Sequence, residues 1–76
     1  MATERAKIKY KPLWKLLIDR DISKQQLREK TSIARSTMVK MVNNEYVAMD
    51  VLVRICLAMD CGMDDIVEIE RSNGGM

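Results

Sequence analysis

A group of small polar and basic side chains near the middle of the chain is best suited to binding chemistry. Arg35, Ser36 and Thr37 follow the isolated apolar residue Ile33, and Lys40 comes about one helical turn later. Arg can bind guanine through its bidentate fork, and Ser and Lys can reach base edges or phosphates. A short helix that presents these groups near its N-terminal end has the chemistry required by a DNA major groove.

These side chains should divide between bases and the sugar-phosphate backbone. Arg35, Ser36 and Lys40 are the candidates for base contacts. Each could instead contact only the backbone, and for Lys40 a phosphate is the stronger alternative. Thr37, the third residue of the expected helix, is a candidate for backbone contact and could equally serve the structure of the helix.

The elements that position this group are predicted by the twenty-residue segment 23–42, SKQQLREKTSIARSTMVKMV. Ser23 and Gln26 have the spacing of a capping box, which begins a helix that buries Leu27. A polar, β-branched break follows at residues 30–33, with Ile33 as the apolar residue of a tight turn. A second helix then carries apolar residues at helical spacing, namely Met38, Met41 and Val42.

In its order of elements the segment resembles the helix-turn-helix of the lambda-repressor/Cro type (XRE-like) of bacterial and phage regulators. Residues 15–20 and 50–56 fall where that family has its first and fourth helices, and residues 63–67 match its short fifth helix. The resemblance covers roughly residues 8–70. It departs at Arg28, where the family usually has a small residue, and at Ser32, where it usually has Gly.

The resemblance implies an all-α, compact five-helix lambda-repressor-like DNA-binding domain over residues 8–70, with its motif at 23–42. The helix at residues 34–43 would enter the major groove of double-stranded DNA and read its sequence. In this family the second helix points its N-terminal N–H groups at a phosphate, which makes Lys24 and Gln25 candidates for backbone contact. Asn43 and Asn44 are further backbone candidates, although capping of the preceding helix is the alternative role for them.

The rest of the chain predicts two more helices and a small pairing of the chain ends. Pro12 is well placed as the first residue of a helix that ends near residues 19–21, and Met49–Met59 has a clear amphipathic pattern. Residues 8–10 and 66–69 could form strands that pair with each other. Residues 1–7 and 71–76 are expected to be flexible.

Composition limits the chain to one small domain with an aliphatic core. Its 76 residues include three aromatics and seven Met. No apolar run is long enough for a transmembrane helix, and the N-terminus lacks the apolar stretch of a signal peptide, so we expect a cytoplasmic protein. The absence of His excludes a four-ligand Cys/His zinc site, and Cys56 and Cys61 are expected to be reduced.

The net charge of +2 hides an uneven distribution along the chain. Residues 1–43 contain eleven Lys and Arg against four acids, a balance of +7. Residues 44–76 contain two Arg against seven acids, a balance of −5. Such a division is typical of a molecule with one face toward a polyanion and another turned away, although clustering by chance on solvated faces gives the same pattern.

These features favour a sequence-specific DNA-binding regulator over other function classes. An enzyme is not expected, because the chain has no His, no nucleophile elbow, no phosphate-binding glycine loop and no metal cluster. We also expect no cofactor and no small-molecule ligand. The alternative is a protein-interaction module of the same fold, either an antitoxin or an accessory regulatory subunit, with the acidic half as its working surface.

One short recognition helix reads only a few base pairs, which is too few to single out a site in a genome. We therefore expect a homodimer on a roughly palindromic site. The candidate contacts between the two copies are Tyr46, Val47 and residues 66–69.

Overall fold

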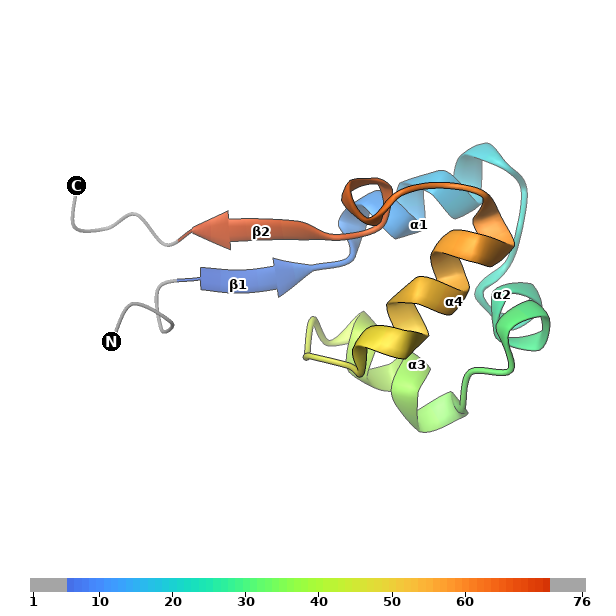
Figure 1. Ribbon diagram of the computed structural model, residues 1–76, viewed down its shortest axis with the longest axis horizontal. Coiled ribbons are helices and arrows are strands. Elements are labelled where there is room, and N and C mark those ends of the chain that lie inside the picture. Colours follow the sequence, from blue (N-terminus) through green and yellow to red (C-terminus); the bar gives the residue numbers. More distant parts are fainter. Residues whose placement is uncertain (1–5, 72–76) are drawn as a thin grey trace.

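A small bundle of helices with a two-stranded sheet projecting from it forms the described part of the chain, residues 6–71 of the computed structural model. Figure 1 places α4 near the centre of the bundle, with the other helices around it and the sheet extending away. The elements in chain order are β1 (Ala6–Lys9), α1 (Lys11–Asp19), α2 (Lys24–Thr31), α3 (Arg35–Val42), α4 (Met49–Met59), the 3-10 helix η2 (Met63–Asp65) and β2 (Glu68–Arg71).

The second helix begins where the sequence predicted, and the first begins one residue before the predicted Pro12. Pro12 lies in the first turn of α1, where its missing N–H costs no hydrogen bond, and the helix buries Leu13 and Leu17. At the start of α2 the Gln26 amide donates to Ser23 Oγ at 3.0 Å. The Ser23 amide donates to Gln26 Oε1 at 2.8 Å, which completes the capping box.

A left-handed residue makes the turn between α2 and α3. Ser32 has φ 59° and ψ 33°, and its amide donates to the carbonyl oxygen of Arg28. A non-glycine residue pays about 1 kcal/mol or more for this conformation, and the burial of the next residue, Ile33 at 4% exposure, offsets that cost. The predicted turn with Ile33 as its apolar residue is confirmed.

The longest helix, α4, has the bounds that its amphipathic pattern predicted and supplies much of the core. It buries Val51, Leu52, Ile55 and Met59 and ends at Asp60 in the left-handed conformation. Leu27, Ile33, Met38 and Leu52, from four successive parts of the chain, meet in one cluster. The whole cluster consists of Tyr10, Leu13, Leu17, Leu27, Ile33, Met38, Met41, Val51, Leu52, Ile55, Met59 and Ile66.

The expected fifth helix is wrong. Residues 6–71 contain four α-helices, and residues 63–67 form only the three-residue 3-10 helix η2 followed by a turn. Gly62 donates to Asp65 Oδ2 at 2.9 Å, so the helix is capped at its start. Ile66 is then buried in the core and the chain becomes extended two residues later, which leaves no room for another helical turn.

The expected pairing of the chain ends is confirmed, with both strands displaced from their predicted positions. β1 and β2 pair antiparallel, with Ile8 opposite Ile69. Opposite charges face each other in this register, and Lys9 Nζ lies 3.0 Å from Glu70 Oε1. Tyr10 and Ile66 are outside the strands because both side chains are fully buried in the helical core.

Ala6, Lys7 and Arg71 belong to the paired strands, although the sequence analysis placed all three in flexible ends. The other residues of those expected ends, 1–5 and 72–76, lie outside the described part of the chain.

Candidate nucleic-acid interface

The outward face of α3 brings together the three residues expected to contact bases. Arg35, Ser36 and Lys40 are exposed, while Met38 and Met41 of the same helix are buried against the core. Because successive residues of an α-helix are turned by about 100°, this burial fixes which side of α3 faces outward. The helix therefore presents two cations and a hydroxyl on the side that the core does not cover.

The start of α3 is open to a ligand. Its N-cap is Ala34, which has no side-chain oxygen to accept a hydrogen bond from the first turn. The amides of the first turn therefore remain without a side-chain cap, and helix N-termini favour negative charge. Thr37, a candidate for backbone contact, is half-buried beside Met38.

Lys24 and Gln25 are both exposed in the first turn of α2. The capping box occupies the Gln26 amide and leaves the amides of Lys24 and Gln25 without intrahelical partners, as in any helix N-terminus. Both side chains have contacts within the chain. Lys24 Nζ lies 4.8 Å from the ring centroid of Trp14, and Gln25 Nε2 donates to Glu29 Oε2 at 3.4 Å.

Asn43 and Asn44 are exposed at the other end of α3, where they complete the helix. The Asn43 amide donates to Val39 O at 3.0 Å, and the Asn44 amide donates to Met41 O at the same distance. Asn44 has φ 59°, the left-handed conformation that Asn tolerates at helix ends. The backbones of both residues thus cap α3, and their side chains remain at the surface.

Tyr10 holds the loop that follows α3. Its side chain is fully buried, and its hydroxyl donates to the carbonyl oxygen of Glu45 at 2.7 Å. Burial raises the pKa of Tyr10, and the neighbouring charge of Tyr46 raises it further. The hydroxyl therefore remains a donor at neutral pH, and it connects the end of α3 to the start of α1.

A hollow lies between β1 and this loop. Its lining combines basic and acidic side chains with two amides: Lys7, Ile8, Lys9, Asn43, Asn44, Glu45, Tyr46 and Glu70. Because the two Lys are matched by two Glu, the hollow offers no net positive charge to a phosphate.

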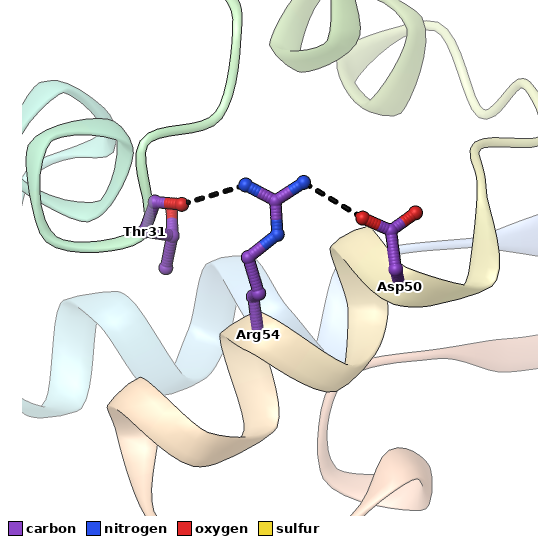
Figure 2. Close-up of polar contacts among 3 residues, drawn as sticks. All are labelled: Thr31, Asp50 and Arg54. Atoms are coloured by element: carbon purple, nitrogen blue, oxygen red, sulfur yellow. Dashed lines mark hydrogen bonds and ion pairs between the residues drawn. The ribbon is translucent and has the colours of Figure 1, made fainter.

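Arg54 lies on α4 and holds the turn between α2 and α3 in place (Figure 2). One terminal nitrogen of its guanidinium donates to the carbonyl oxygen of Thr31 at 3.0 Å, and the other donates to Asp50 Oδ2 at 2.8 Å. Thr31 ends α2, so the cation satisfies a free carbonyl at the negative end of that helix. Arg54 is a positioning residue that sequence reasoning missed, because the i,i+4 spacing from Asp50 indicates only a surface ion pair.

Arg28 is a large residue at a position of the motif where a small one is usual, and its side chain is accommodated along the surface of α2. The side chain is half-buried, and its Nε is buried without a hydrogen-bond partner among the described residues. The stem therefore lies along the helix surface, and α2 still buries Leu27 completely.

Two valines of α3 are exposed. Val42 was expected on the buried face but is 48% exposed. Val39, which the sequence analysis did not single out, is 52% exposed. Its spacing could have identified it, because it lies four residues after Arg35 and three after Ser36 and so must share their face.

The two cysteines are free, as expected, and both are half-buried beside the core. Burial raises the pKa of the Cys61 thiol, and the Cys56 thiol raises it further. The described residues contain no group of three potential metal ligands. None of the helices in residues 6–71 has the length and apolarity needed to cross a membrane.

Comparison with known proteins agrees with this geometry. The model of the Cro/C1-type HTH DNA-binding domain matches residues 12–72 of the chain. No curated protein sequence is similar enough to count as a relative. Among solved structures, the crystal structure of the transcriptional regulator VanUg (Form II) is similar, with 42% sequence identity and a TM-score of 0.86. The similarity covers 88% of this chain and 89% of that chain. The chain belongs to the family of Cro/C1-type helix-turn-helix DNA-binding domains.

Proposed function

We propose that the protein is a sequence-specific transcriptional regulator that binds double-stranded DNA with α3 in the major groove. The observation that carries the proposal is the outward face of α3, where Arg35, Ser36 and Lys40 are exposed while Met38 and Met41 are buried. In this proposal Arg35 reads a guanine, and Ser36 and Lys40 contact neighbouring base edges.

Backbone contacts on both sides of α3 would set its depth and register in the groove. We assign Lys24, Gln25 and Thr37 to one side of the contact and Asn43 and Asn44 to the other. The exposed Lys24 and the free amides at the start of α2 support a phosphate there. The balance of +7 over residues 1–43, the part of the sequence that includes α2 and α3, supports binding to a polyanion.

The working unit in this proposal is a homodimer on a roughly palindromic site. Two copies related by a twofold axis would place their recognition helices one DNA turn apart, roughly 34 Å. Tyr46 is 71% exposed and Ile69 is 67% exposed, so both are available for contact between copies. Ile66 is fully buried and is therefore withdrawn from the candidate interface. The ligand in this proposal is genomic DNA, and we therefore expect the protein to be in the cytoplasm.

The test compares affinity for selected and scrambled DNA. Duplexes bound by the wild type are selected from a random pool at low salt, and affinities are then measured for the recovered sequence and a scrambled version of it. The wild type should prefer the recovered sequence. Arg35→Ala should lose about 1–3 kcal/mol of that preference, the usual energy of one bidentate base contact.

Arg71→Ala is the matched control, because it removes one exposed arginine from β2, away from α3. It should keep the preference for the recovered sequence. If both variants lost the preference to the same extent, the loss in Arg35→Ala would be due to the removed charge and not to a base contact. If the folded wild type bound no DNA at low salt, the proposal would be wrong and a protein-interaction module would replace it.

A further inference from the structure

We propose that Val39 is a specificity-determining residue that contacts the 5-methyl group of a thymine. The inference rests on the proposed binding of α3 in the major groove and adds an apolar contact to the polar ones already assigned. It concerns a side chain that is more than half exposed on the recognition helix and has no assigned role.

The helical geometry places Val39 within the reading face. At about 100° per residue, Val39 is turned by about 40° from Arg35 and by about 60° from Ser36, and it lies between them around the helix axis. The buried Met41 lies about 160° away, nearly opposite. Any base pair that Arg35 and Ser36 reach together would therefore lie in front of Val39 as well.

A valine at this position does not stabilise the folded protein appreciably. At 52% exposure the side chain gains little from burial, and β-branched residues are poorer helix formers than Ala or Lys. An exposed apolar side chain between an arginine and a serine becomes favourable when a partner covers it. Because Arg35 and Lys40 flank this face with positive charge, the partner should be an apolar group carried on a polyanion.

Thymine supplies such a group. Its C5 methyl is the apolar contact that a base pair offers in the major groove, and small apolar side chains recognise it there. Val39 would therefore distinguish a thymine from a cytosine at one position, beside the guanine proposed for Arg35. The recognition helix would then read two adjacent base pairs by different chemistry.

The test removes the methyl group from the DNA. In the sequence recovered by selection, each thymine is replaced in turn by deoxyuridine, which lacks only the 5-methyl group, and affinities are measured. The wild type should weaken about fourfold at one position in each half-site, which corresponds to about 0.8 kcal/mol for one buried methyl. Val39→Ala, which lacks both γ-methyl groups, should lose most of the difference between the thymine and deoxyuridine duplexes at that position.

Val53→Ala is the matched control, since Val53 is a valine of similar exposure, 46%, on α4. It should keep the fourfold response to deoxyuridine. Thermal unfolding of both variants should be close to that of the wild type, because both side chains are exposed. The inference fails if no thymine responds, if the recovered site has none, or if Val39→Ala keeps the response. Failure of the wild type to select any sequence would instead overturn the proposed function together with this inference.

Discussion

Lys24 and Arg35 are both exposed cations, yet their surroundings differ in a way that separates their expected roles. Lys24 stands at the first position of α2 with its ammonium near the Trp14 ring, beside two free helix amides. Arg35 is exposed at the start of α3, where its side chain is free to reach a base. The first arrangement suits a phosphate, and the second suits a base edge.

Lys24→Ala should therefore weaken binding to all DNA sequences alike. Because each neutralised phosphate contributes about 0.9 to the slope of log affinity against log salt, the slope should fall by about one unit. Titrations of selected and scrambled duplexes at several salt concentrations measure both quantities. Lys24→Arg, which keeps the charge, is the control. A loss confined to the selected duplex would reassign Lys24 to base readout.

For single residues, the sequence predicted the polar and basic side chains of the candidate site but not the exposed valine among them. Arg35, Ser36 and Lys40 were identified because their chemistry suits a base edge and their spacing suits one helix face. Val39 was not among the predicted site residues, because only polar and basic side chains of this helix were considered for contacts with DNA. Only the phase of the helix, fixed by which methionines are buried, shows it at the surface.

The helix-turn-helix depends on α4, an element outside it. Arg54 reaches from α4 to the last carbonyl of α2 at 3.0 Å, which holds the turn at a fixed position before α3 begins. Arg54 and Asp50 also form an ion pair on the surface of α4. The two contacts of the Arg54 guanidinium should contribute differently to stability, because only the contact with Thr31 joins two helices.

Arg54→Met should cost about 1 kcal/mol of stability, since it removes a charged donor from the Thr31 carbonyl oxygen but keeps the apolar stem. This loss is small for a hydrogen bond from a charged donor because the arginine side chain is 43% exposed. Asp50→Asn, which removes the exposed i,i+4 ion pair and a negative charge from the first turn of α4, should cost about 0.5 kcal/mol. Urea unfolding of both variants gives the comparison. Equal losses would mean that the contact with α2 contributes nothing.

Elements with strong local signals were predicted well, and elements set by packing were not. The capping box fixed the start of α2, and the apolar periodicity fixed both ends of α4. The fifth helix failed because Ile66 is drawn into the core directly after η2 and the chain then has to pair with β1. That constraint comes from the other end of the chain, and no local pattern at residues 63–67 contains it.

At the scale of the whole molecule, the two ends of the chain meet in a sheet that projects from the helical bundle (Figure 1). The facing strands carry opposite charges, Lys on β1 and Glu on β2. Pairing of two β2 edges across a twofold axis would bring Glu68 and Glu70 of the two copies together, and like charges opposite each other destabilise a strand pair. Tyr46 is therefore the better candidate for the dimer contact.

The proposed homodimer predicts two protein chains for each selected site. Sedimentation of the protein with a single palindromic duplex should give a two-to-one complex, and DNA containing one half-site should bind more weakly. Tyr46→Ala should lower the cooperativity of binding while leaving the sequence preference intact. A one-to-one complex on a non-palindromic selected site would show that the protein works as a monomer.

Readout of the major groove by α3 is tested most directly by methylation interference on the selected duplex. Methylation of guanine N7 modifies the major groove, whereas methylation of adenine N3 modifies the minor groove. We expect guanine methylation to block binding of the wild type at one position in each half-site, and Arg35→Ala to be insensitive at that position. Interference from adenine N3 alone, or guanine interference that is unchanged in Arg35→Ala, would contradict major-groove readout by this helix.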